Sequence, residues 1–295
     1  MTTRAVSAPT PWREVALDYV RLTKPRVISL LLVVTVGAMM VAADGLPELT
    51  TLVVTVIGGY LAAGGAHSIN QFADRDLDRH MTRTDARPVV NGRISPIRAL
   101  VFGIALGLAS FLLLGLLVNW LAAGLAMAGL VLYVGLYTAW LKRTTVHNIV
   151  IGGAAGAVPP LVGWAAVTGE LGLTAWLMFA IVFYWTPPHF WALSLMLERD
   201  YARAGVPMLP VVRGERETRR QIVLWTLVMM GVSLLPAAAG VAGLTYLVAA
   251  ALAGAIMLGL AFQLDREGGR WARHTFSYSL LYLVIIFVAL GVDAA

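Results

Sequence analysis

The sequence contains no cysteine and few charged residues. Because there is no cysteine, disulfides, thiolate metal ligands and cysteine nucleophiles are all excluded. Only 13% of the 295 residues are charged, whereas 59% are hydrophobic, and the mean hydropathy is +0.79. Soluble domains carry about twice that charged fraction. The scarcity of charge therefore excludes an ordinary soluble domain and indicates an integral membrane protein.

Apolar stretches close to twenty residues long recur along the chain. As an α-helix, a stretch of this length crosses a hydrocarbon core of about 30 Å. The sequence predicts an all-α, polytopic membrane helical bundle with about nine spans, formed by a single domain over 27–295. Residues 1–26 are expected to be a cytoplasmic N-terminal tail, because the first twelve lack the apolar core of a cleaved signal. The predicted spans are 27–43, 49–69, 99–118, 121–140, 149–168, 173–195, 221–240, 243–263 and 275–292.

Positive charge is confined to alternate connections between these spans. With the predicted topology, all 22 Lys and Arg residues fall on one side of the membrane. The opposite side carries only Asp44, Glu48, Glu170 and Asp293. The positive-inside rule then places the N-terminus in the cytoplasm and the C-terminus outside. Topology explains the net charge of +6, so no nucleic-acid partner is expected.

Residues 70–88, which we call the first acidic segment, directly follow an apolar span. Asn70, Asp74 and Asp78 are spaced i, i+4, i+8, so a helix that continued into the headgroup region would stack them on one face. Bare charge is costly at this depth. Oxygen ligands suit Mg²⁺, which typically takes one or two carboxylates together with substrate phosphates. The alternative interpretation is a hydrated loop whose acids pair with neighbouring arginines.

Cationic side chains accompany these acids. Arg83 and Arg87 are four residues apart and would form a second, cationic stripe suited to phosphate oxygens. Lys142 and Arg143 end another span and could reach the same phosphate, or they could be the anchors that topology requires. Asp76 would point away from the acidic stack on such a helix.

A histidine, His189, lies inside a predicted span, directly after Pro187-Pro188 and between aromatic residues. An intramembrane histidine is a site candidate by default. The alternative is a buried histidine satisfied by a backbone carbonyl. The double proline is expected to interrupt the helix. Glu198 and Asp200 follow on residues 198–210, the second acidic segment, where they could hold a second cation or pair with nearby arginines.

The two acidic segments resemble each other. Asp-Leu-Asp-Arg at 76–79 precedes Asp-Tyr-Ala-Arg at 200–203 by 124 residues. This spacing indicates a duplicated pair of helical units whose acidic loops face each other across a cavity.

Several segments together resemble the UbiA-type intramembrane prenyltransferase superfamily and, within it, the branch that farnesylates protohaem IX. Asn-x-x-x-Asp-x-x-x-Asp is a signature of the superfamily. The Pro-Pro-His-Phe and Asp-Tyr-x-x-Ala-Gly-x-Pro-Met-Leu-Pro elements distinguish the haem branch. The matching stretches, in order, are 22–26, 70–88, 137–148, 152–161, 185–190 and 200–210.

The resemblance implies nine helices around a lipid-accessible cavity in the bacterial inner membrane, with both acidic segments on the cytoplasmic side. It implies transfer of a farnesyl group from farnesyl diphosphate to a vinyl group of haem b. The product would be haem O for haem-copper oxidase biogenesis, with Mg²⁺ as cofactor and a downstream haem A synthase as a candidate partner. The second acidic segment departs from the Asp-x-x-x-Asp of the quinone-precursor branch, which leaves His189 free to face the haem.

The resemblance also carries residue roles. The implied catalytic residues are Asp74, Asp78, Lys142 and His189. The implied diphosphate contacts are Asn70, Arg83 and Arg87, and the further candidate substrate contacts are Arg143, Asp200, Tyr201, Arg203, Tyr137 and Trp185. The implied Mg²⁺ ligands are Asn70, Asp74 and Asp78, with Glu198 and Asp200 as candidates for a second ion.

Two other functions fit parts of the sequence. One is a prenyltransferase acting on an aromatic quinone precursor, against which the His-Phe and Pro-Met-Leu-Pro elements argue. The other is a transporter for an anionic substrate. Transporters place their binding charges near the bilayer midplane, whereas nearly all charges here lie at the cytoplasmic ends of the spans.

Overall fold

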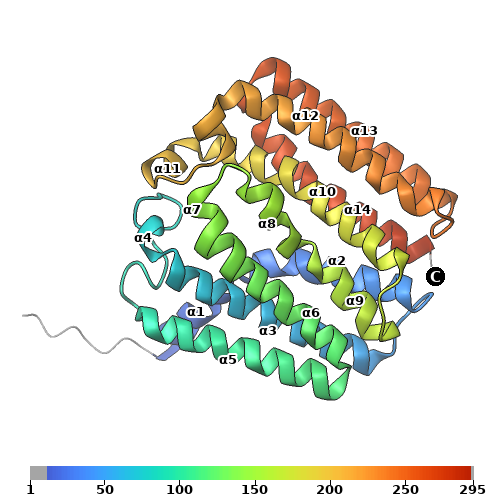
Figure 1. The fold of residues 1–295 in the computed structure, drawn as a ribbon, viewed down its shortest axis with the longest axis horizontal. Coiled ribbons are helices and arrows are strands. Elements are labelled where there is room, and N and C mark those ends of the chain that lie inside the picture. The colour runs from blue at the N-terminus through green and yellow to red at the C-terminus, as the bar shows by residue number, and fades with distance from the viewer. Residues whose placement is uncertain (1–11, 294–295) are drawn as a thin grey trace, which may run out of the picture.

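A computed structural model describes residues 12–293, and every regular element in that range is helical (Figure 1). The elements are α1 (Trp12–Thr23), α2 (Pro25–Ala42), α3 (Leu49–Ala73), α4 (Arg75–Asp78), α5 (Pro96–Leu117), α6 (Trp120–Val131), η1 (Leu132–Leu141), α7 (Lys142–Thr144), α8 (Asn148–Gly156), α9 (Val158–Thr168), α10 (Leu173–Met196), α11 (Glu198–Arg203), α12 (Leu209–Ala238), α13 (Leu244–Glu267), η2 (Gly269–Trp271) and α14 (Ala272–Asp293). The predicted all-α class is confirmed.

Eight helical stretches within 12–293 are long and apolar enough to span a membrane. They correspond to eight of the nine predicted spans, with α6–α7 and α8–α9 each forming one. The ninth, α10, has 24 residues, or about 36 Å of helix, and runs beside α12 and α14 (Figure 1). The proline, tryptophan and histidine residues of α10 lower its mean hydropathy below that of the other eight spans. The protein is therefore a multi-pass membrane protein of about nine spans.

The short helices α4, α7 and α11 lie together at one end of the bundle, which we call the loop face (left in Figure 1). The C-terminal end of the described chain and the tight turns between α5 and α6 and between α9 and α10 lie at the opposite end. Because both acidic segments belong to the loop face, charge and apolar surface are separated along the bundle axis.

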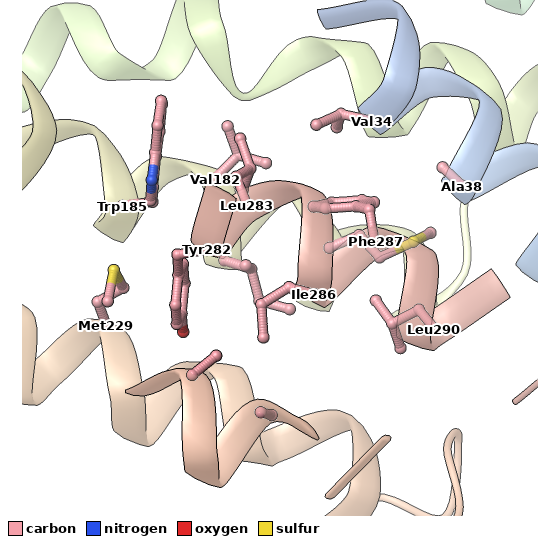
Figure 2. Packing of buried hydrophobic residues seen from close by; sticks show 14 of the residues in the cluster. Val34, Ala38, Val182, Trp185, Met229, Tyr282, Leu283, Ile286, Phe287 and Leu290 are labelled. Atoms are coloured by element: carbon pink, nitrogen blue, oxygen red, sulfur yellow. The ribbon is translucent and has the colours of Figure 1, made fainter. Parts of the chain in front are cut away.

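Small residues and large apolar side chains hold the bundle together in different places. Helices α3 and α5 approach so closely that a Cβ added at Gly65 would lie 2.6 Å from the carbonyl oxygen of Gly103. In the other half, Figure 2 shows α2, α10, α12 and α14 converging on a cluster that includes Trp185, Tyr282 and Phe287. The spans are thus packed on one another, with lipid-facing side chains outside.

Three local features differ from the sequence predictions. Helix α10 continues through Pro187 and Pro188, so the expected interruption is wrong there. A helix does break at Ala157, just before a second proline pair, Pro159-Pro160. Helix α12 begins at Leu209, twelve residues before the predicted span, and bends at Gly214, whose φ is 80°. Part of the segment 1–26 forms α1, whereas residues 1–11 lie outside the described residues.

One span changes its winding near the loop face. After α6, residues Leu132–Leu141 form a π-helix, η1, before α7 returns to α-helical geometry. π-helical turns are rare and are frequently found at functional sites. This segment faces the end of α3, so its winding determines which side chains meet the first acidic segment.

Candidate active site at the loop face

The first acidic segment begins where α3 ends. The helix is broken at Asp74, whose φ and ψ are −91° and 7°. The i+4 hydrogen bonding nevertheless continues, because the Asp74 N–H donates to the Asn70 carbonyl at 2.8 Å and the Asp78 N–H to the Asp74 carbonyl at 2.8 Å. The side-chain amide of Asn70 donates to Oδ2 of Asp74 at 2.7 Å. The predicted proximity of Asn70 and Asp74 is confirmed, whereas within the described residues the side chain of Asp78 bonds Arg87 and not the other two.

The π-helical span pairs with α3 in parallel register. Nδ2 of Asn70 donates to Oγ1 of Thr138 at 3.1 Å, and four residues further along both chains Nζ of Lys142 donates to Oδ2 of Asp74 at 2.6 Å. From the start of α2, Nζ of Lys24 donates to Oδ1 of Asn70 at 3.0 Å. Two other spans thus reach the Asn70–Asp74 pair at the end of α3.

Arginines neutralise the remaining acids of the segment. Arg87 donates to Oδ2 of Asp78 at 2.5 Å. Arg143 donates hydrogen bonds to both carboxylate oxygens of Asp76, at 2.7 and 2.8 Å, and lies 3.6 Å from Oδ1 of Asp74. The hydrogen bonds from Arg143 hold the pKa of Asp76 well below its ordinary value. Asp74, Asp76, Lys142 and Arg143 thus form one connected network, and the Arg87–Asp78 pair is joined to it by the backbone hydrogen bond from Asp78 to Asp74; we call these side chains, with Asn70 and Lys24, the ionic cluster.

The centre of the ionic cluster is buried although it is charged, whereas the side chain of Asp76 is 59% exposed. Asn70, Asp74 and Asp78 are at most 3% exposed, and Lys142 is 9% exposed. Oδ1 of Asp74 is fully enclosed and accepts no hydrogen bond from the described residues. Burying charge in this way is costly unless each ion is paired and hydrogen-bonded. The charged neighbour of this Oδ1 in the described chain is Arg143, 3.6 Å away, so this carboxylate oxygen keeps hydrogen-bonding capacity for a further donor.

The oxygen donors of the cluster suit Mg²⁺, which prefers carboxylate and carbonyl oxygens and keeps positions for phosphate. Within residues 12–293, no group of three or more His, Cys, Asp or Glu side chains is gathered closely enough to hold a metal by itself. The donors here are two carboxylates and an amide, so a phosphate would have to complete the coordination. The assignment of Asn70, Asp74 and Asp78 to Mg²⁺ remains a prediction.

The two acidic segments meet on the loop face. Oγ1 of Thr82 donates to Asp200 at 3.1 Å, and Arg203 donates to Thr82 at 2.7 Å and to Asp200. A pocket of about 430 Å³ lies at this junction, lined by Arg79, His80, Met81, Thr82, Asp85 and Arg203. The predicted facing of the two loops is confirmed.

Several predicted site residues make no hydrogen bond or ion pair with the ionic cluster among the described residues. Arg83 is exposed, and it forms no ion pair with any residue of 12–293. The expected helical stripe with Arg87 is wrong, because residues 79–94 form turns. Glu198 is half-buried, without a polar side-chain contact in the described chain, and Tyr201 packs in an apolar cluster with Met81. The structure does not bring Glu198 to the acids of the first segment.

His189 belongs to a second, aromatic cluster. Its ring stacks on Trp185 at 4.2 Å and on Phe276 at 4.7 Å between ring centroids. Nδ1 is hydrogen-bonded to Oγ of Ser279 at 2.7 Å. The partner of the histidine is therefore a hydroxyl on α14 and not the backbone carbonyl of the alternative interpretation. Tyr137 stacks on Tyr133 in η1, closer to the ionic cluster.

Sequence reasoning assigned no role to Lys24, Thr138, Thr82 or Ser279, although each makes a bond described above. The sequence contained one indication that Lys24 matters: it immediately precedes Pro25 within 22–26, one of the stretches that carry the resemblance. The structure holds Lys24 at φ 55° and ψ 62°, a left-handed conformation uncommon for a residue with a side chain. Such strain costs about 1–3 kcal/mol and persists at functional sites.

The fold and this site define a class: an all-α, multi-pass membrane protein with a buried ionic cluster at one end of its bundle. The UbiA prenyltransferase family matches residues 30–290, and the chain belongs to that family.

Individual relatives agree with the family. The chain is 56% identical to the protoheme IX farnesyltransferase of Roseiflexus sp. (strain RS-1), over 94% of this chain and 52% of the relative. It is 54% identical to the protoheme IX farnesyltransferase of Symbiobacterium thermophilum, over 95% of both chains. The chain thus spans about half the length of the Roseiflexus protein and nearly all of the Symbiobacterium protein.

Solved structures share the fold at low identity. A digeranylgeranylglyceryl phosphate synthase superposes with a TM-score of 0.77 at 18% identity, covering 95% of this chain and 99% of the other. A UbiA homolog from Archaeoglobus fulgidus, bound to DMAPP and Mg²⁺, gives a TM-score of 0.66 at 16% identity, covering 93% and 99%.

Proposed function

We propose that this protein transfers a farnesyl group from farnesyl diphosphate to a vinyl group of haem b and yields haem O and diphosphate. The allylic carbon–oxygen bond breaks, and its electron pair leaves with the diphosphate. The vinyl group supplies the electrons for the new carbon–carbon bond. Water then adds to the resulting cation and loses a proton, so the side chain becomes a hydroxyethylfarnesyl group.

The observation that carries this proposal is the buried ionic cluster at the mouth of a membrane bundle. A diphosphate with an apolar tail needs cations at the membrane surface and a hydrophobic interior below them. Lys142, Lys24 and Arg87 supply the cations at the end of α3. The relatives named protoheme IX farnesyltransferase support haem as the acceptor, as do the Pro-Pro-His-Phe and Pro-Met-Leu-Pro elements.

The ionic cluster would stabilise the leaving diphosphate. In the structure, Lys142 and Arg87 are neutralised by Asp74 and Asp78. When diphosphate and Mg²⁺ bind, the acids would take the metal and both cations would turn to phosphate oxygens. Asn70, Asp74 and Asp78 would hold the ion, which supplies electrostatic stabilisation of the charge on the leaving oxygen. Stabilisation of a developing charge by cations in a water-excluded site is commonly a large contribution to catalysis.

The interior next to the cluster would protect the allylic cation. Tyr133 and Tyr137 stack with ring centroids 5.8 Å apart on the π-helical segment that carries Lys142. An aromatic face stabilises a nearby cation by about 0.5–2 kcal/mol, and the exclusion of bulk water prevents its capture. On the acceptor side, His189 and Trp185 would contact the haem.

The charge distribution supports a cytoplasmic orientation of this site. The loop face carries the arginines, so it would face the cytoplasm of the inner membrane, with the C-terminus outside. Haem O is an intermediate that a haem A synthase would consume, and such an enzyme is the proposed downstream partner.

The proposal is tested with purified protein, haem b and farnesyl diphosphate in detergent, by following the mass of the extracted pigment. A farnesyl-plus-water mass gain that disappears on chelation of Mg²⁺ supports it. A pigment of unchanged mass, together with prenylation of an added hydroxybenzoate, would refute haem as the acceptor.

A further inference from the structure

Ser279 on α14 holds two aromatic side chains of α10. Its hydroxyl oxygen is 2.7 Å from Nδ1 of His189 and 2.7 Å from the carbonyl oxygen of Phe276. Its own carbonyl oxygen accepts a hydrogen bond from Nε1 of Trp185 at 2.7 Å. Ser279 is completely buried, so these contacts do not compete with bulk water.

The position of the hydroxyl proton follows from these distances. A carbonyl oxygen only accepts hydrogen bonds, so the 2.7 Å contact with Phe276 requires the proton of the Ser279 hydroxyl. The hydroxyl oxygen must then accept a hydrogen bond from His189, which places a proton on Nδ1. Since a neutral imidazole carries a single N–H, Nε2 keeps its lone pair.

The aromatic neighbours fix the plane of the ring. The ring plane of Trp185 makes an angle of 19° with the imidazole plane, and that of Phe276 makes an angle of 26°. Both rings therefore stack on the histidine. His189 is 6% exposed; Nε2 has no hydrogen-bond partner within residues 12–293 and is not among the enclosed polar atoms. By contrast, both ring nitrogens of His67 are enclosed. Nε2 of His189 therefore points a lone pair at accessible space inside a span.

We propose that Ser279 is a positioning residue that holds His189 in the tautomer whose Nε2 binds the iron of the haem substrate. This inference rests on the proposed function, because it needs haem as the acceptor. Metal-bound histidines almost always donate their other ring N–H to an oxygen, which fixes the tautomer and raises the basicity of the ligand. Here the hydroxyl oxygen of Ser279, which donates its own proton to the Phe276 carbonyl, is the oxygen that accepts the Nδ1–H of His189.

The test uses the full chain with ferrous haem b and no farnesyl diphosphate, so it reads haem binding apart from transfer. Resonance Raman spectroscopy reports the iron–histidine stretching band, which responds to the hydrogen bond at Nδ1. The band is expected in the natural protein and absent in His189→Ala. In Ser279→Ala it should move to lower frequency, with haem affinity weaker by at least about tenfold. Ser279→Thr keeps a hydroxyl and should restore both.

Ser194→Ala is the matched control. Ser194 is also completely buried, lies on α10, and donates to the carbonyl three residues earlier at 2.9 Å, as Ser279 does. Its loss should leave the band in place. Exogenous imidazole added to His189→Gly should bring the band back, which separates ligation from folding.

Each outcome has a defined meaning. A band that survives in His189→Ala, or that Ser279→Ala does not move, overturns the inference. Absence of the band in the natural protein overturns it too, even where the pigment assay shows farnesyl transfer. An intact band together with a pigment that never gains mass contradicts the proposed function and leaves the ligation standing.

Discussion

The two acidic segments use the same residue types but are built differently. In the first, Asp74 and Asp78 are buried, and Asp74 takes its cation from another span, since Lys142 lies 2.6 Å away. In the second, Asp200 pairs with Arg203, three residues away on the same short helix, and that arginine is 58% exposed. Two segments of similar sequence therefore have different contacts. The first contains a site to which other spans contribute, and the second contains an ion pair between neighbouring residues.

This difference indicates which segment does the chemistry. Exposed pairs of the second kind contribute about 0–1 kcal/mol, and they form wherever acids and arginines are close in sequence. Gathering buried charge from three spans is costly unless the arrangement serves a charged ligand. The comparison favours a single metal–diphosphate centre on the first segment, with the second segment closing the pocket at Thr82.

The largest expected effect comes from Asp74→Asn. It removes a buried carboxylate, so the rate of farnesyl transfer should fall by about 100-fold or more. It also leaves Lys142 without its partner, which destabilises a buried pair by about 3–5 kcal/mol. Pigment mass and thermal unfolding in the same detergent measure both. The double variant with Lys142→Met should regain stability but not activity, and recovery of both would contradict the account.

Arg87→Ala should have the next largest effect. Arg87 is the cation nearest Asp78, at 2.5 Å, and would turn to the diphosphate. Its loss should raise the KM for farnesyl diphosphate by about tenfold, or about 1.4 kcal/mol. Steady-state kinetics at saturating haem measure this. A changed KM for haem with an unchanged KM for farnesyl diphosphate would place Arg87 elsewhere.

Asp200→Asn applies the same chemical change to the second segment. Because its ion pair is local and partly exposed, the rate should change by less than about threefold. The assay is the one used for Asp74→Asn, so the two variants form a direct comparison. Equal losses in both would show that the segments are equivalent after all.

Asp76→Asn should have the smallest effect. Hydrogen bonds from Arg143 hold the pKa of Asp76 low, so its contribution is present above the ordinary unfolded value of about 3.9 and is lost as pH falls through the lower folded value. Its side chain is 59% exposed, so the contribution is below about 1 kcal/mol. Thermal unfolding should differ from the natural protein by a constant amount between pH 5 and pH 8.

The spans and the Asn70–Asp74 contact could be predicted because they depend on local features. Hydropathy follows from composition over about twenty residues, and an i, i+4 pair lies on one helical face. Backbone hydrogen bonds carry that register across the break at Asp74, so the prediction was confirmed even though the helix ends there.

The remaining contacts depend on tertiary structure. Lys24 and Thr138 reach Asn70, and Lys142 reaches Asp74, only because α2 and the π-helical segment after α6 pack against α3, and no local pattern reveals that winding. Ser279 is ninety residues from His189 and looks like any small residue in a span. The Arg83 stripe failed because residues 79–94 turn instead of continuing as a helix.

Binding of Mn²⁺, a paramagnetic stand-in for Mg²⁺, tests the central claim most directly. Electron paramagnetic resonance would follow Mn²⁺ uptake in the presence of a farnesyl diphosphate analogue that does not ionise, for the natural protein, Asp74→Asn and Asp200→Asn. We expect analogue-dependent binding that Asp74→Asn abolishes and Asp200→Asn leaves intact. Binding that depends on Asp200 and survives in Asp74→Asn would contradict a centre built on the first acidic segment.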